Sequence, residues 1–163
     1  MNILLGAVNA KYIHSNPAVY SLRAYAIETG RCKKEEIQVA EYTINQRLED
    51  IRRDLFRRSP QFVGFSCYIW NIAFVEELAE EFHKLRPEVP VWVGGPEVSY
   101  ETESFLREHP QITGVMIGEG EKTFCELAEY YAGESRRDKE KQKIQETQRT
   151  GEGKSTEERS KPG

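Results

Sequence analysis

Five short apolar runs alternate with five helix-like segments over residues 1–132, and this alternation constrains the fold more than any other feature. The first run, residues 2–8, is almost wholly apolar, which is typical of a central strand covered on both faces. Residues 37–43 alternate apolar and polar side chains, as an edge strand does. The remaining strands are expected at residues 62–65, 91–93 and 113–117.

Strands that alternate with helices at this spacing are parallel and are joined by right-handed crossovers. We therefore expect an α/β domain with a five-stranded, parallel, doubly wound sheet of Rossmann-like or flavodoxin-like type. The economical strand order is 2-1-3-4-5, in three α/β/α layers. Its switch point lies between the first and third strands, so the loops after these strands open a crevice that the loops after the fourth and fifth strands extend.

Two helices carry clear signals in the sequence. Asn16-Pro17 reads as an N-cap followed by proline at the first helical position, and Gly30 is a natural C-terminal stop. Residues 72–85 carry the best helical stripe in the chain, and Pro87 ends it.

The composition changes after Gly133. Residues 134–163 contain no aromatic side chain and only one aliphatic side chain larger than alanine, Ile144. Such a segment buries too little apolar surface to offset its ordering entropy. We therefore expect one domain over residues 1–132 and a charged, disordered linker or tail over 133–163, with transient helix over 134–148 as the alternative.

The net charge is −4, so the chain lacks the excess of basic residues that is typical of nucleic-acid-binding domains, and no nucleic-acid partner is expected. The basic group Arg52, Arg53, Arg57 and Arg58 reads as a solvated helix face, with a phosphate or partner site as the alternative. No apolar stretch approaches the roughly 20 residues needed to span a bilayer, and no signal peptide opens the chain. We expect a soluble, cytoplasmic protein without a membrane partner.

The chemistry of the loops excludes several doubly wound families. A receiver domain needs carboxylates where this chain has Asn9, Lys11, Ser66 and Cys67. A P-loop needs glycine where Glu121 stands, and a dinucleotide site needs a glycine-rich first loop, which is absent. The three cysteines show no CxxC or CxxxCxxC spacing, so they cannot by themselves build a zinc site or an iron–sulfur cluster. The remaining crevice suits a large, flat, mostly uncharged ligand with many amides.

Four motifs follow the first, third, fourth and fifth strands in turn: Asn9–Asn16, Gly64–Asn71, Gly94–Glu97 and Gly118–Glu121. In this order they resemble the N-terminal cobalamin-binding domain of B12-dependent radical SAM proteins, a broad group that includes the anaerobic magnesium-protoporphyrin IX monomethyl ester oxidative cyclase. The resemblance covers residues 1 to about 132. The Gly-Gly-Pro-Glu and Gly-Glu-Gly-Glu pair carries most of its specificity.

The resemblance implies that cobalamin lies across the carboxyl ends of the strands, with its nucleotide tail inserted into the side of the sheet. Residues 9–14 would form the loop under the corrin, Ser66 would hydrogen-bond the tail, and Gly94-Gly95 would let the tail pass close to the backbone. The implied cofactor-binding residues are Asn9, Ala10, Lys11, Tyr12, His14, Ser66, Cys67, Tyr68, Trp70, Gly94, Gly95, Pro96, Glu97, Gly118, Glu119 and Gly120.

The chain departs from the resemblance in two ways. The cobalamin motif DxHxxG is absent, because Tyr12 and Pro17 occupy its Asp and Gly positions when its histidine aligns with His14. His14 is then either the lower cobalt ligand or a loop histidine near the corrin or in solvent. The CxxxCxxC triad that binds a [4Fe–4S] cluster and cleaves S-adenosylmethionine is also absent. We expect an excised domain or a truncated relative, not catalytic alone. Its parent would be a metal-binding, iron–sulfur radical SAM oxidoreductase, cyclase or methyltransferase with a downstream barrel.

Other interpretations stay open at this point. The domain could keep the fold without a ligand and serve as a structural or docking partner, or it could be an enzyme with Cys67 as nucleophile. Tyr68 and Trp70 could stack on a ligand or pack at the start of a helix. Cys67 could equally be a buried filler. Glu97 and Glu119 could orient ligand amides or complement helix dipoles, and the double glycine could simply make a tight turn.

Overall fold

The computed structural model describes residues 1–11 and 15–157, with side chains as far as residue 149. The chain divides into two compact units, Met1–Ala128 and Glu129–Gly163. The first unit holds every strand in the described part of the chain, and the site is built on it.

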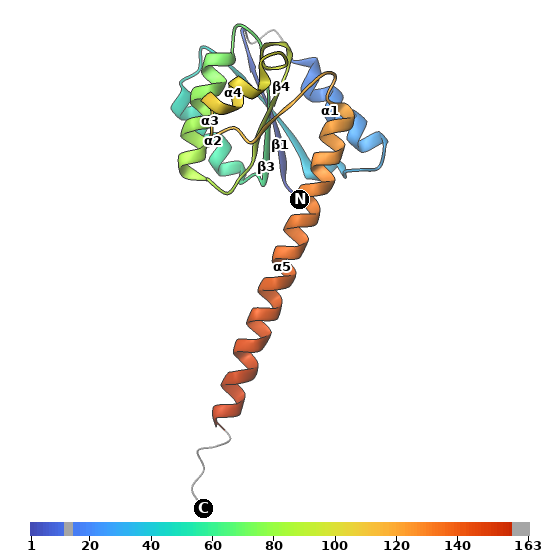
Figure 1. Ribbon diagram of the computed structural model, residues 1–163, viewed down its shortest axis with the longest axis vertical. Helices are drawn as coiled ribbons and strands as arrows, with labels where there is room; N and C mark the ends of the chain where they lie inside the picture. Colours follow the sequence, from blue (N-terminus) through green and yellow to red (C-terminus); the bar gives the residue numbers. More distant parts are fainter. Residues whose placement is uncertain (12–14, 158–163) are drawn as a thin grey trace, which may run out of the picture. The chain divides into compact units, whose positions relative to one another are not determined.

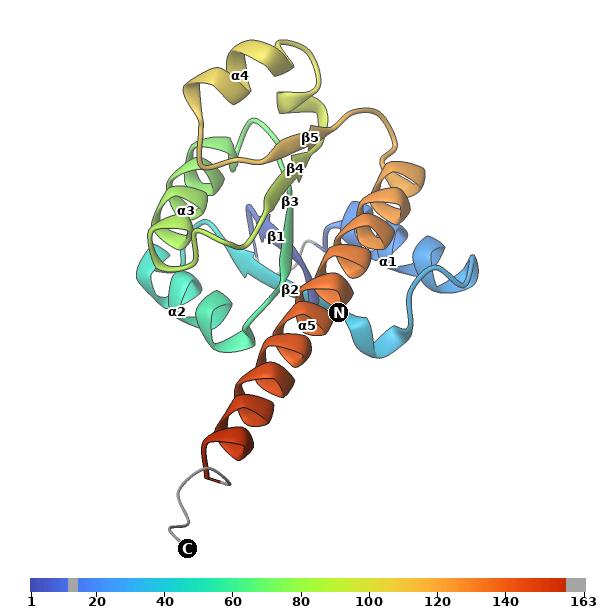
Figure 2. The ribbon, with the colours of Figure 1, turned by 60° about the horizontal axis from the view of Figure 1, so that its bottom comes forward.

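The five strands form one parallel sheet in the order β2-β1-β3-β4-β5, as the sequence predicts. Figure 1 shows β1, β3 and β4 of this sheet, and Figure 2 also shows β2 and β5. Every residue of β1 is buried and this strand lies inside the sheet, whereas β2 lies at the edge, both as expected. The strands are β1 (Ile3–Asn9), β2 (Ile37–Thr43), β3 (Phe62–Ser66), β4 (Val91–Gly94) and β5 (Gly114–Met116).

Helices cover both faces of this sheet, so the three-layer prediction is confirmed. Figure 2 shows α2 and α3 on one face and α1 with the start of α5 on the other. Short 3-10 turns lie before β2 (Lys34–Glu36) and after β4 (Pro96–Val98). The helices are α1 (Pro17–Glu28), α2 (Leu48–Arg58), α3 (Ile72–Leu85), α4 (Thr102–Glu108) and α5 (Glu121–Glu157).

The signals at both ends of α1 act as the sequence predicts. The Asn16 side chain accepts a hydrogen bond from the Ala18 amide at 3.1 Å, and Pro17 is the first helical residue. Gly30 follows the helix at φ +70°, a left-handed conformation that costs glycine little. This start fixes the position of α1, whose first turn borders the site.

The face of the sheet under α2 and α3 carries the main core. Val63 and Phe65 of β3 and Val91 and Val93 of β4 point to this face, where Leu78 of α3 is wholly buried among them. Because side chains alternate along a strand, Phe62, Gly64 and Ser66 of β3 point to the opposite face. There Phe62 packs on Phe124 of α5, with ring centroids 6.2 Å apart.

The second unit, described by itself, is the helical segment that continues α5 as far as Glu157. Tyr130 and Tyr131 make an edge-to-face ring contact in it, at 5.1 Å. Residues 134–148, for which transient helix was the alternative prediction, are helical in the structure, and the helix extends nine residues beyond this range. The disordered tail over 133–163 stays a prediction about the chain in solution. None of the helices in residues 1–11 and 15–157 is long and apolar enough to cross a bilayer.

Candidate functional site

The buried polar side chains of the described residues gather at one edge of the sheet. They are Asn9, Asn16, Thr43, Ser66 and Asn71. All five lie at the carboxyl ends of β1, β2 and β3 or at the starts of α1 and α3. We call this edge the carboxyl edge. Burying polar groups costs free energy unless they are paired, so their concentration at one edge marks a site rather than ordinary core.

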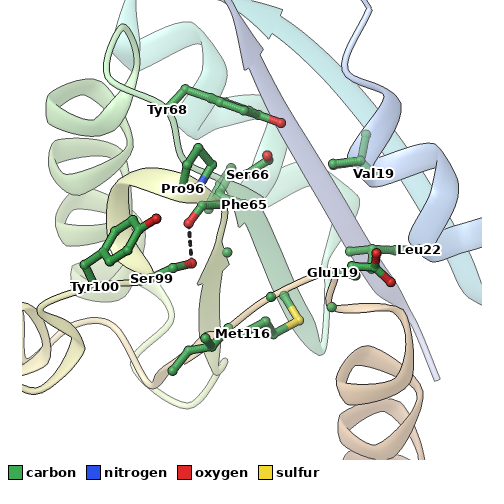
Figure 3. A pocket seen from close by; sticks show the side chains of 16 residues that line it. Val19, Leu22, Phe65, Ser66, Tyr68, Pro96, Ser99, Tyr100, Met116 and Glu119 are labelled. Atoms are coloured by element: carbon green, nitrogen blue, oxygen red, sulfur yellow. Dashed lines mark hydrogen bonds between the residues drawn. The ribbon is translucent and has the colours of Figure 1, made fainter.

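A cavity of about 550 Å³ opens at the carboxyl edge, on the α1 face of the sheet. We call it the first cavity. Its walls come from α1, from the loops after β3 and β4, and from the turn after β5 (Figure 3). Most of its surface is apolar. Its lining residues are Ala18, Val19, Leu22, Phe65, Ser66, Tyr68, Gly94, Gly95, Pro96, Ser99, Tyr100, Met116, Ile117, Gly118, Glu119 and Gly120.

Ser66 supplies the buried polar group of the first cavity. Its side chain is 7% exposed and lines the cavity (Figure 3). Within the described part of the chain its hydroxyl has no hydrogen-bond partner, although the Ser66 carbonyl accepts a bond from Asn71. Among the described residues the one fully enclosed side-chain oxygen without a partner is Thr43 Oγ1, so the Ser66 hydroxyl is open to the cavity and available to a bound molecule.

A second pocket of about 460 Å³ lies beside the first and shares Tyr68 with it. The rings of Tyr68 and Trp70 stack nearly parallel, with centroids 4.5 Å apart and planes at 3°. The two aromatic side chains therefore stack on each other, while Trp70 stays half exposed. The second pocket is lined by Asn9, Ala10, Ser15, Asn16, Pro17, Tyr68 and Trp70.

Asn71 links β1 and β3 at the switch point between them, and it was not among the site residues predicted from the sequence. Its side-chain amide donates to the carbonyls of Val8 and Ser66, both at 3.0 Å, and its oxygen accepts from the Tyr68 amide at 2.7 Å. Pairing of β1 with β3 runs only as far as Gly6, so Val8 and Ser66 lie where the two strands diverge. Asn71 replaces the missing ladder bonds and orients the turn that carries Tyr68.

Glu41, on the edge strand β2, organises the loop after β1. One carboxylate oxygen accepts from the Asn9 side chain and the Asn16 amide, both at 3.2 Å, and the other accepts from the Tyr20 hydroxyl at 2.7 Å. The bond from Tyr20 is the main cause that lowers the pKa of Glu41, and the same bond raises the pKa of Tyr20. Both ends of the loop are thus tied to one carboxylate.

The double glycine makes a tight turn, and its two members differ. Gly95 has φ +111°, and a Cβ there would collide with the carbonyl oxygen of Cys67, so the backbone itself requires glycine. A Cβ on Gly94 would lie 3.3 Å from the Met116 carbonyl oxygen, a close contact. Gly118 has φ +82° with no atom within 4 Å of a built Cβ, so it faces open space.

The structure brings eleven of the sequence-predicted site residues to the two cavities and leaves others away from them. Lys11 is exposed and lines neither cavity. Glu97 is also exposed, and it borders a separate depression with Glu76 and Glu101. Tyr12 and His14, including the predicted cobalt ligand, lie outside the described residues.

Cys67 packs inside the protein. Its side chain is wholly buried in the core under α3 and lines neither cavity. Burial, with smaller contributions from the charges of Glu76 and Glu97, raises the pKa of its thiol to about 12. Because the thiolate is the reactive form, this environment argues against Cys67 as a nucleophile.

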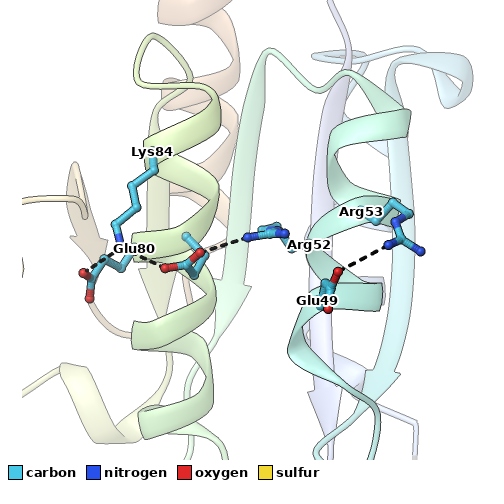
Figure 4. A network of polar contacts seen from close by, with 6 residues as sticks. Glu49, Arg52, Arg53, Glu80 and Lys84 are labelled. Carbon is cyan, nitrogen blue, oxygen red and sulfur yellow. Dashed lines mark hydrogen bonds and ion pairs between the residues drawn. The ribbon is translucent and has the colours of Figure 1, made fainter.

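The basic group on α2 is largely compensated by acidic side chains. Arg52 pairs with Glu81 of α3 at 2.9 Å, and Arg53 with Glu49 of the same helix at 3.4 Å (Figure 4). Arg58 likewise pairs with Asp54 at 2.8 Å. This agrees with a solvated helix face and leaves little charge for a phosphate. In the described part of the chain, no group of three or more His, Cys, Asp or Glu side chains is arranged to hold a metal ion.

The comparisons with known proteins agree with the fold. The family model described as B12 binding domain matches residues 3–128. The chain therefore belongs to the B12 binding domain family, and the family resemblance that the sequence predicts is confirmed. The more distant link with the oxidative cyclase stays a prediction.

Two curated relatives match shorter stretches. The cobalamin-dependent radical SAM methyltransferase TokK of Streptomyces tokunonensis is 35% identical over 68 residues, which is 42% of this chain and 10% of the relative. The uncharacterized methyltransferase PH0819 of Pyrococcus horikoshii is 32% identical over 80 residues, 49% of this chain and 17% of the relative. The chain thus spans a small fraction of the length of these relatives.

Solved structures share the fold at low sequence identity. The radical S-adenosylmethionine methyltransferase TsrM of Kitasatospora setae matches with a TM-score of 0.60 and 23% identity, over 77% of this chain and 25% of that chain. The cobalamin-dependent S-adenosylmethionine radical enzyme OxsB matches with a TM-score of 0.58 and 18% identity, over 81% of this chain and 18% of that chain. A CheY-like protein of Pseudomonas aeruginosa, TadZ, matches with a TM-score of 0.53 and 14% identity, over 79% of this chain and 94% of that chain. Since such different proteins share it, the fold alone does not decide the ligand.

Proposed function

We propose that residues 1–128 are the cobalamin-binding module of a B12-dependent radical SAM enzyme and hold the corrin across the carboxyl edge of the sheet. The observation that carries this proposal is the apolar first cavity with the hydroxyl of Ser66 in its wall, in a chain of the B12 binding domain family. Open α/β sheets bind ligands at this edge, where the strand order reverses.

The residues present fit the chemistry of cobalamin. Its nucleotide tail ends in a flat aromatic base, which suits the largely apolar first cavity better than the amide-bearing corrin does. Ser66 would donate to or accept from a polar atom of the tail. The corrin would then lie over the second pocket and the stacked pair Tyr68 and Trp70.

In this proposal the chain binds and orients, and reaction chemistry belongs to the parent enzyme. Bound cobalamin supplies a carrier for a methyl group or an assistant in a radical step. The [4Fe–4S] cluster and S-adenosylmethionine would bind a downstream barrel, with residues 133–163 as the connecting segment. The names of the relatives favour methyl transfer as the parent's reaction.

Titration with hydroxocobalamin, followed by gel filtration and visible absorbance, tests the proposal. Corrin absorbance should elute with the protein. Ser66→Ala should weaken binding about fivefold, because one hydrogen bond contributes about 1 kcal/mol. Ser104→Ala is the matched control, since Ser104 is an exposed serine on α4 that does not line the first cavity.

Failure of absorbance to elute with well-folded protein would overturn the proposal. That result would favour the alternative function, a domain of the same fold that serves as a structural or docking partner without a ligand. Equal affinity of native protein and Ser66→Ala would instead remove Ser66 from the site while leaving corrin binding in place.

A further inference from the structure

Met116 is the last residue of β5 and belongs to the wall of the first cavity. It lines the cavity but is only 4% exposed. Figure 3 shows its side chain on the opposite side of the cavity from Tyr68. Its side chain is therefore in contact with the cavity while most of its surface is covered by protein.

Two glycines on neighbouring strands locate the Met116 methyl group independently. A Cβ built on Gly64 of β3 would lie 3.9 Å from this methyl carbon, and a Cβ built on Gly94 of β4 would lie at the same distance. The thioether therefore lies across two positions of the sheet that carry no side chain. It fills space that glycine leaves empty.

Strand β3 shows which residues lie deeper in the protein than Met116 on this face of the sheet. On this face β3 presents Ser66, Gly64 and Phe62 in order away from the carboxyl edge. Ser66 lines the first cavity, whereas Phe62 packs on Phe124. A ligand that enters past Ser66 would reach the Met116 side chain before it reaches the aromatic pair.

We propose that Met116 sets the depth of the first cavity and so selects for the nucleotide tail of the corrinoid. This inference rests on the proposed function. An unbranched thioether adapts to the shape of its neighbour and makes favourable contacts with aromatic rings, so it suits the flat base at the end of the tail. A rigid, bulkier side chain would shorten the cavity, and a smaller one would leave the base without a contact.

The test compares hydroxocobalamin with cobinamide, a corrinoid that lacks the nucleotide. Met116→Phe should weaken hydroxocobalamin binding at least about tenfold, the scale on which a hydrophobic pocket responds to misfit, and should leave cobinamide binding within about twofold. Met116→Ala should weaken only hydroxocobalamin, by about fivefold, while Met116→Leu should leave the ratio of the two affinities near the native value. Thermal unfolding of each variant without ligand checks that the fold is kept.

The outcomes separate the two proposals. If the Phe and Ala variants change both affinities equally, Met116 does not meet the tail and the inference is overturned, while corrin binding stands. If the native protein binds neither corrinoid, the proposed function fails and the inference fails with it. Should Met116→Phe not fold, the change in affinity ratio for Met116→Ala against Met116→Leu decides the question.

Discussion

The two faces of the sheet are built from the same strands but differ in how completely side chains fill the space beside them. On the α2 and α3 face, Val63, Phe65, Val91 and Val93 fill the space under the helices with apolar side chains. On the α1 face, the same strands present Gly64, Ser66 and Gly94 and leave a cavity of about 550 Å³. The α2 and α3 face is fully packed by side chains of the protein, and the α1 face has room for a bound molecule.

This difference shows how a doubly wound domain separates stability from binding. Dense packing on the α2 and α3 face contributes to the folding free energy, since buried apolar area is the main stabilising term. The α1 face can then carry glycine or small residues at a few positions while the domain stays folded. Equal substitutions on the two faces should therefore have unequal effects on stability and on binding.

A matched pair of leucines gives the largest expected effect. Leu78→Ala, on the filled face where the side chain is wholly buried, should lower the free energy of unfolding by about 3 to 5 kcal/mol. Leu22→Ala should cost less, about 2 kcal/mol or below, because Leu22 already borders the cavity. Urea unfolding of both variants measures the difference, and equal losses would show that the two faces are packed alike.

The same pair sharpens the comparison when corrinoid binding is measured. Leu22→Ala should weaken hydroxocobalamin binding, because it removes part of the cavity wall, whereas Leu78→Ala should leave it unchanged in protein that remains folded. The reverse pattern would place the ligand on the α2 and α3 face.

Two glycines at the carboxyl edge give an intermediate effect. Gly95→Ala should lower the free energy of unfolding by roughly 2 kcal/mol or more, from the positive φ and the contact with the Cys67 carbonyl. Gly118→Ala should cost only about 1 kcal/mol, because its φ is also positive but its surroundings are open. Thermal unfolding of both variants is the measurement. A Gly95→Ala protein as stable as the native one would contradict the tight turn.

The smallest effect concerns Glu41 and pH. Its pKa is lowered below the ordinary value of 4.5, mainly by the Tyr20 hydroxyl. The stability that this adds is therefore present above about pH 4.5 and is lost as the pH falls through the lower folded-state pKa. Because Glu41 is exposed, solvent screens the effect and only its direction is predicted.

Melting temperatures of native protein and Glu41→Gln, measured across the acid range, check this prediction. The native protein should be the more stable at neutral pH, and the gap should close as the pH falls below about 4.5. Tyr20→Phe should reproduce most of the change, since its hydroxyl is the main cause. A gap that is independent of pH would contradict the assignment to the carboxylate.

The strands, their order and the cap of α1 could be predicted because they depend on local patterns. Apolar runs, Asn16-Pro17 and Gly30 act within a few residues of themselves, and alternation of strands with helices leaves few topologies. The turns that converge at the carboxyl edge follow from parallel pairing. The sequence by itself therefore determined which loops meet.

Only the tertiary structure decided which side chains of those loops face the cavity. Cys67 and Glu97 stand in the same motifs as Ser66 and Pro96, yet one is buried under α3 and the other borders a different depression. Asn71, Glu41 and Met116 each act through at least one partner distant in sequence: Val8 for Asn71, Tyr20 for Glu41 and Gly64 for Met116. The physical reason is that strand register and the packing of distant helices set the direction of each side chain, and no local pattern encodes them.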